Sequence, residues 1–208
     1  MAPIRLSRPS ARAVVAAAAL VVIAVATALT TVPPHSWELR VFDAINGLPE
    51  APAVVWWPVM QLGALGGAVA MTVVIATLRR PRLAFAYGTS CAIAWLGAEF
   101  FKSVVDRARP GDLGIDVVIR GARAVGSGFP SGHSAVAFAG AIVLVFALRG
   151  RWRVVPIALA AIVGLARIYV GAHLPLDVLG GAGVGVLIGV VLNTVAHLPK
   201  TAALGDRR

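Results

Sequence analysis

The chain has 208 residues, of which 59% are hydrophobic and 13% are charged, and its mean hydropathy is +0.86. This composition excludes an ordinary soluble domain and is typical of a polytopic membrane protein with a single domain. The net charge of +10 does not indicate a nucleic-acid partner, because the basic residues flank apolar runs. The single cysteine, Cys91, lies inside an apolar run, so the sequence predicts no intrachain disulfide and no cysteine-based metal site.

The first apolar run covers residues 13–32 and follows a basic segment, residues 1–12. Its 20 residues are enough for one membrane span. A cleaved signal peptide is the competing interpretation, because Ala26, Thr27 and Ala28 mimic a cleavage site. The run is longer than a usual signal core, so we predict a retained first span.

A short amphipathic helix is predicted next, after two prolines. Trp37, Val41, Ile45 and Leu48 recur at helical spacing, with charged residues between them. This pattern is typical of a helix that lies at the membrane interface and anchors the chain there.

Five further apolar segments complete the predicted bundle. They cover residues 54–78, 83–101, 131–148, 154–170 and 176–198. Glycines four residues apart predict close helix contacts in the second and the sixth spans, and in the sixth we expect packing within the bundle rather than dimerisation. The fold class is therefore all-α, a six-span transmembrane bundle over residues 13–198, followed by a basic tail at 199–208.

The positions of the basic residues predict the topology. With six spans, one side holds the N-terminal segment, the 79–82 loop, the 149–153 loop and the C-terminal tail, and these carry 12 of the 19 Lys and Arg residues. The positive-inside rule places both termini in the cytoplasm. The 102–133 loop and the 167–177 stretch then share the outer face.

The outer loop opens with two cations, Lys102 and Arg109, followed by Pro110. They are seven residues apart, about two helical turns, so we expect them on one face of a helix that Pro110 stops. Two cations on one face suit a phosphate group, although an ordinary basic membrane flank has the same appearance. Glu99 lies one turn before Lys102, and a local ion pair between them is expected.

The loop closes with a glycine-rich stretch, residues 128–134, that opens the fourth span. Free backbone N–H groups and the positive end of the helix dipole make such a start a natural anion site. Gly132 lets the backbone approach a ligand closely, and Ser131 adds a hydroxyl group while also serving as a helix cap. His133, in the first turn, is placed to give a proton to a leaving group.

A third polar stretch separates the last two spans. Arg167 supplies a permanent cation, His173 can act as a nucleophile or a base, and Asp177 lies four residues further on. Ionisable groups are costly near a bilayer and are usually functional there. The alternative is a helix-end Arg and a loop His with no shared task.

Together the three stretches resemble the signature of the type 2 phosphatidic acid phosphatase superfamily, which includes membrane lipid phosphatases and soluble vanadium haloperoxidases. Its parts here are Lys102-x6-Arg109-Pro110, residues 130–133 (Pro-Ser-Gly-His) and Arg167-x5-His173-x3-Asp177. One departure is Ala166, where the family often has Ser before the third-motif Arg. The resemblance covers residues 54–198.

The resemblance implies roles for these residues. His173 would attack phosphorus and form a phosphohistidine, Asp177 would hold its other ring nitrogen, and His133 would protonate the leaving oxygen and then activate water. The phosphoryl oxygens would be held by Lys102, Arg109, Ser131, Gly132 and Arg167. Three cations and a helix N-terminus can stabilise the transferred phosphoryl group without a metal or other cofactor, and the sequence has no carboxylate cluster suited to Mg²⁺.

The sequence therefore predicts a metal-independent lipid phosphatase in a bacterial inner membrane, acting at the outer face on a polyprenyl diphosphate. Alternative substrates are phosphatidylglycerol phosphate, phosphatidic acid and a polyprenyl-linked sugar phosphate. From other classes, a vanadate-binding haloperoxidase and a lipid-binding or flipping protein remain, but six spans disfavour the first and the complete His-His-Asp set disfavours the second. The expected partner is a membrane lipid, and no oligomeric state is assigned.

Overall fold

The computed structural model describes residues 10–51 and 53–195, and these contain helices and no strand. The predicted tail at 199–208 and most of the basic N-terminal segment lie outside the described residues. Two short 3-10 turns, Pro110–Asp112 and Gly150–Arg153, accompany the α-helices. The all-α prediction is confirmed, and the α-helices are α1 (Ala11–Thr30), α2 (Ser36–Asn46), α3 (Ala53–Gln61), α4 (Leu65–Thr77), α5 (Pro81–Val104), α6 (Gly132–Ala147), α7 (Val154–Tyr169) and α8 (Pro175–Val195).

Three helical segments of the described chain are long and apolar enough to cross a membrane: α1, α8 and Gly150–Tyr169, which ends in α7. The bent pair α3–α4 makes a fourth if it counts as one span. Helix α6 is apolar but has only 16 residues, and α5 does not belong to this set although it has 24. The fold is thus that of a membrane-spanning helical bundle, and the count of six spans stays a prediction.

The predicted second span at 54–78 is not one straight helix. Helices α3 and α4 meet at a break with a bend of 68°. Gly63 lies in this break, where a methyl group would sit 2.6 Å from the backbone oxygen of His133 and 2.8 Å from Val163 Cγ1. Its neighbour in the pattern, Gly67, faces the carbonyl of Gln61 across the bend. The predicted close helix contact is therefore present at Gly63, which packs on α6 and α7, whereas Gly67 packs against the bend itself.

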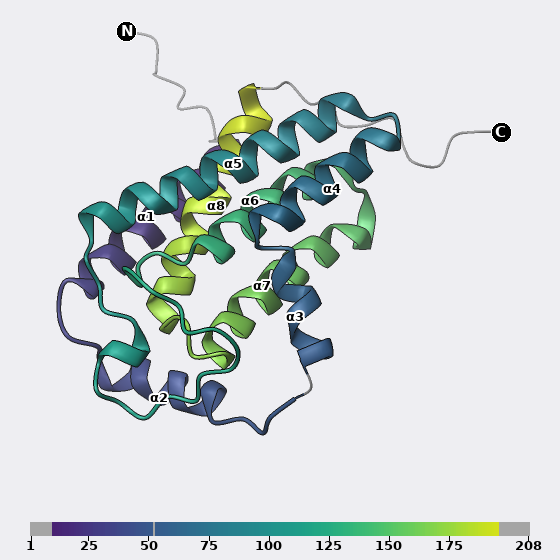
Figure 1. Ribbon diagram of the computed structural model, residues 1–208. Coiled ribbons are helices and arrows are strands. Elements are labelled where there is room, and N and C mark those ends of the chain that lie inside the picture. The colour runs from purple at the N-terminus through teal and green to yellow at the C-terminus, as the bar shows by residue number, and fades with distance from the viewer. Residues whose placement is uncertain (1–9, 52, 196–208) are drawn as a thin grey trace, which may run out of the picture.

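Helix α6 is the centre of the bundle and packs against α5, α7 and α8 (Figure 1). The glycines of α8 allow close packing, because side chains at Gly181 and Gly185 would collide with the backbone of Ser131 and Ala135. Packing within the bundle is therefore confirmed as their role. Helix α1 covers α8, with Ile23 against Gly183.

The amphipathic helix is present as α2, and it has one exposed side and one buried side. Trp37 and Val41 are 39% and 40% exposed, as expected for a membrane-facing side. Glu38, Phe42 and Asn46 are buried on the other side, so α2 also packs into the protein. Figure 1 shows α2 and the 105–131 segment at one end of the bundle, with the α4–α5 and α6–α7 connections at the other.

Candidate active site

A pocket of about 280 Å³ collects most of the predicted site residues. Six of the eight line it: Lys102, Arg109, Gly132, His133, Arg167 and His173. The rest of its lining comes from Glu99 and Trp95 of α5 and from Gly63, Ala64 and Leu65 at the α3–α4 break. The break thus forms one wall of the site. The other two predicted residues, Ser131 and Asp177, are fully buried and lie outside the lining.

Lys102 and Arg109 reach the pocket by a different route from the one expected. Helix α5 ends at Val104, so Arg109 is not on the helix, and Pro110 begins a 3-10 turn instead of stopping α5. The backbone of Arg107 pairs with the returning chain, accepting from Gly128 N at 2.7 Å, and this replaces further helical bonds. The predicted ion pair between Lys102 Nζ and Glu99 Oε1 is present at 2.7 Å.

Arg109 is fixed by the loops on both sides of the pocket. Its Nε donates to the carbonyls of Val125 and Gly126 at 3.1 and 2.9 Å, and its Nη1 donates to Ala172 O at 2.9 Å. Nη1 also lies 3.4 Å from Nε2 of His173. Burial lowers the pKa of Arg109 below its ordinary value, yet a guanidinium remains charged at neutral pH.

Arg167, in the last turn of α7, has spare hydrogen-bonding capacity. Its Nη1 contacts only a weak acceptor, Met60 Sδ at 3.7 Å, and its buried Nε has no partner among the described residues. A buried guanidinium with unused donors that lines a pocket is ready for an anion. Ala166, before it, packs among apolar residues that include Met60 and Tyr169.

His173 lies in the turn between α7 and α8, with 2% of its surface exposed. Its Nδ1 is 2.8 Å from the carbonyl oxygen of Gly128. Since a carbonyl can only accept, Nδ1 carries the proton, and the lone pair of Nε2 faces Nη1 of Arg109. Burial lowers the pKa of His173 to about 4, with Arg167 and Arg109 acting in the same direction and Asp177 opposing them. The imidazole is therefore neutral at pH 7, as a nucleophile requires.

Asp177 sits close to His173 without being its hydrogen-bond acceptor. Its Oδ2 is 3.6 Å from Nδ1 and accepts instead from Leu174 N at 2.8 Å, in the first turn of α8. At this distance the carboxylate favours protonation at Nδ1 and stabilises positive charge on the ring.

The start of α6 provides the predicted helix terminus. Ser131 is the N-cap, and its Oγ accepts from Ser134 N at 3.4 Å and from Ser134 Oγ at 3.1 Å. Its hydroxyl thus serves the cap within the described chain. A methyl group at Gly132 would lie 3.8 Å from Lys102 Nζ, so the helix start and this cation face the same space.

Sequence reasoning missed Arg107, which is one of the unassigned positions between Lys102 and Arg109. Arg107 is buried and pairs with Glu38 of α2 and with Asp177. Although burial works against its charge, the two carboxylates hold the pKa of Arg107 above its ordinary value. The one available signal was the spacing of Glu38, Phe42 and Asn46, which puts two polar residues on one face of α2.

The comparisons with known proteins agree with the signature. The family model described as the PAP2 superfamily matches residues 83–199. A lipid A 1-phosphatase of Rhizobium etli is 31% identical over 186 residues, with 74% of this chain and 77% of that protein covered. A lipid A 4'-phosphatase of Bacteroides thetaiotaomicron is 35% identical over 105 residues, with 48% of this chain covered. This chain spans about half the length of the Bacteroides relative, 47%.

Two crystal structures share the fold. LpxE of Aquifex aeolicus has a TM-score of 0.68 at 24% identity and covers 77% of this chain and 96% of its own. A transmembrane PAP2-type phosphatidylglycerolphosphate phosphatase from Bacillus subtilis has a TM-score of 0.71 at 19% identity, with 88% and 96% covered. The family match covers more than half of this chain, and the chain therefore belongs to the PAP2 superfamily and is a membrane lipid phosphatase of that family.

Proposed function

We propose that the protein removes a phosphate group from a membrane lipid through a phosphohistidine formed at His173. The observation that carries this proposal is the arrangement around the pocket: a pocket-lining imidazole whose Nε2 carries no proton, beside three cations and a helix N-terminus. The buried Nε of Arg167, which has no hydrogen-bond partner in the described part of the chain, supports an anion as the ligand of this pocket.

The reaction follows from these positions in two steps. His173 Nε2 attacks phosphorus while the bond to the leaving oxygen breaks, and His133 gives that oxygen a proton. Water then attacks the phosphohistidine with His133 as base, releasing inorganic phosphate and restoring the ring. Lys102, Arg109 and Arg167 stabilise the equatorial oxygens in both steps, and the chain's own groups suffice without a metal ion.

The pocket wall supports a substrate that stays in the membrane. Leu65 and Trp95 line the pocket and are each 37% exposed, so apolar side chains that face lipid also border the phosphate site. A polyprenyl diphosphate fits this arrangement, since its chain can remain in the bilayer while the three cations hold two phosphates. We propose it as the substrate.

Lipid A is a second candidate, because two relatives that cover about three quarters of this chain are lipid A 1-phosphatases. Phosphatidylglycerol phosphate, phosphatidic acid and polyprenyl-linked sugar phosphates have the same reacting group and remain rivals. We propose that the site faces outward from a bacterial inner membrane with both termini in the cytoplasm, on the charge pattern of the loops.

The test is phosphate release by purified protein in detergent with a metal chelator present. Each candidate lipid is offered in turn, and His173→Ala is the matched variant. We expect chelator-resistant release that disappears in the variant, with the highest kcat/KM for the polyprenyl diphosphate.

The outcomes separate the parts of the proposal. Release that survives in His173→Ala would remove this residue as the nucleophile. A higher kcat/KM for lipid A would replace the proposed substrate and leave the mechanism standing. If the protein binds these lipids and releases no phosphate, the lipid-binding interpretation gains over hydrolysis.

A further inference from the structure

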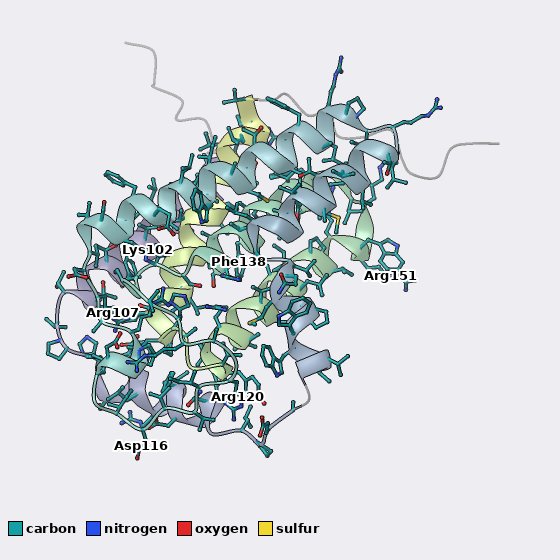
Figure 2. All side chains as sticks on the ribbon, viewed as in Figure 1. Lys102, Arg107, Asp116, Arg120, Phe138 and Arg151 are labelled. Atoms are coloured by element: carbon teal, nitrogen blue, oxygen red, sulfur yellow. The ribbon has the colours of Figure 1, made fainter. Side chains whose placement is uncertain are left out.

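A buried ion cluster adjoins the active site without lining its pocket. Arg107 donates to both carboxylate oxygens of Glu38, at 2.7 and 3.1 Å, and to Asp177 Oδ1 at 2.7 Å. Both acids are fully buried, and the side chain of Arg107 is 5% exposed. Buried charges are costly unless they are paired, so this cluster needs all three members. Figure 2 shows Arg107 near Lys102, at the same end of the bundle.

Arg107 holds both of the groups that surround Nδ1 of His173. Its side chain fixes Asp177, whose Oδ2 lies 3.6 Å from Nδ1. Its backbone oxygen accepts from Gly128 N at 2.7 Å, and the carbonyl of Gly128 is the acceptor for Nδ1 at 2.8 Å. One residue therefore sets the place of the hydrogen-bond acceptor and of the nearest carboxylate.

Glu38 extends this support from α2 to the turn that carries His173. Its Oε1 accepts from Leu176 N at 3.0 Å, while Asp177 Oδ2 accepts from Leu174 N at 2.8 Å. The start of α8, directly after the turn, is thus bonded to α2, and Asp177 closes the turn itself by its bond to Leu174 N.

We propose that Arg107 and Glu38 are positioning residues for phosphoryl transfer: they fix the imidazole of His173 through Gly128 and Asp177 and touch no substrate. This inference rests on the proposed function, because it assigns His173 as the nucleophile. Its physical basis is that a reacting atom displaced by about 1 Å can lose on the order of 10²-fold in rate.

Arg120, which binds the last residue of α2, provides a matched control. Arg120 donates to the carbonyls of Asn46 and Tyr169 at 2.8 and 2.6 Å and stacks on the Tyr169 ring at 4.0 Å. It also joins α2 to the end of α7, but it contacts neither His173 nor Asp177. If both arginines only link α2 to the bundle, substituting either one should have a similar effect on kcat. If Arg107 positions His173, substituting Arg107 should lower kcat and substituting Arg120 should not.

The experiment compares wild type, His173→Ala, Arg107→Gln, Arg107→Lys, Glu38→Gln and Arg120→Gln. The readouts are kcat and KM against pH for the best lipid substrate, Tm, and inhibition by vanadate. We expect Arg107→Gln to lose on the order of 10²-fold in kcat with KM and vanadate inhibition nearly unchanged, because the three pocket cations remain. Arg107→Lys should recover part of the loss, and Arg120→Gln should keep wild-type kcat even if Tm falls.

The pH profile adds a signature that a structural role lacks. His173 is faced by Lys102, Arg109, Arg167, His133 and Asp177, and all five of these groups stay in every variant. Removing the cation in Arg107→Gln should move the acid limb of kcat/KM to higher pH, and removing the anion in Glu38→Gln should move it to lower pH. Glu38→Gln keeps the shape of the side chain, so it decides the question if Arg107→Gln does not fold.

Each failure has a distinct result. If wild type releases no phosphate from any lipid, the proposed function falls and this inference falls with it. If wild type is active and His173→Ala is not, two results would overturn the inference alone: normal kcat in Arg107→Gln, or equal losses in Arg107→Gln and Arg120→Gln. Acid limbs that do not move in opposite directions would also overturn it.

Discussion

At the scale of single residues, the proposed function gives the two histidines separable tasks. His173 would supply the nucleophilic nitrogen, and His133 lines the same pocket from the first turn of α6. We expect His133→Ala to lose on the order of 10²–10⁴ in rate, as when a positioned acid or base is removed. The measurement is single-turnover phosphate release from a lipid phosphate.

A better leaving group makes this test specific. A substrate whose leaving oxygen belongs to a nitrophenol needs little protonation, so the first-step defect of His133→Ala should shrink with it. His35→Ala serves as the control, because His35 is the residue that precedes α2, its ring stacks with that of Trp37, and it lies outside the pocket lining. An equal defect with both substrates would remove His133 from leaving-group protonation.

Burial of neutral His173 also predicts how stability depends on pH. Its pKa is about 4 in the folded protein against an ordinary 6.5, so between these values the unfolded chain binds a proton that the folded chain does not. Stability must then fall as pH drops from 6.5 toward 4, by on the order of 3 kcal/mol. Thermal unfolding of His173→Gln should show a flatter pH slope than wild type, and identical slopes would contradict the neutral, buried state.

The sequence predicted these residues unevenly, for a physical reason. Pocket residues such as Lys102, His133 and Arg167 belong to short motifs whose spacing can be read directly from the sequence. The pair between Glu38 and Arg107 joins positions 69 residues apart and has no local signature. Only the three-dimensional arrangement distinguishes Arg107, which is buried, from Arg123, which forms an exposed pair with Asp112.

At the scale of elements, the α3–α4 break supplies one wall of the candidate catalytic pocket. Gly63 is the critical position, since a methyl group there would press on His133 O and Val163. We expect Gly63→Ala to cost about 1–3 kcal/mol, as overpacking does, and to reduce kcat by moving the start of α6. The measurements are Tm and phosphate release by the purified variant.

Gly66 supplies the matched control three residues away. It lies in the first turn of α4, and a methyl group there would meet nothing within 4 Å. Gly66→Ala should therefore keep activity and hold or raise Tm, because alanine favours a helix. If both variants behave alike, contact with α6 is not what makes Gly63 sensitive.

Element boundaries show where local patterns stop being informative. The apolar runs located the helices within a few residues, because a helix in a membrane must be apolar over its length. The spacing of Lys102 and Arg109 suggested one helix, but backbone bonds to residues 127 and 128 end α5 at Val104. Those bonds come from a segment more than 20 residues away, which helical periodicity does not report.

At the scale of the whole molecule, the arginine-rich loops and the candidate site lie at opposite ends of the bundle. The predicted site residues gather at the end that carries α2, while the loops rich in arginine lie at the other end (Figure 1). The 12 basic residues on the predicted cytoplasmic side all lie outside the motifs, and the motifs all lie on the opposite side. This agreement supports an outward-facing site, and it gives a direct test of orientation.

Two exposed residues, Asp116 and Arg151, mark the two ends (Figure 2). In a Cys91→Ala background, which removes the buried native thiol, each is changed to cysteine in turn and labelled in intact cells with a membrane-impermeant maleimide. Asp116→Cys should react at once, because the positive-inside rule places its loop outside, and Arg151→Cys should react only after permeabilisation. Retained phosphatase activity in both variants shows that the labelled protein is folded. Labelling in the opposite order would place the site in the cytoplasm and require a substrate pool on the inner leaflet.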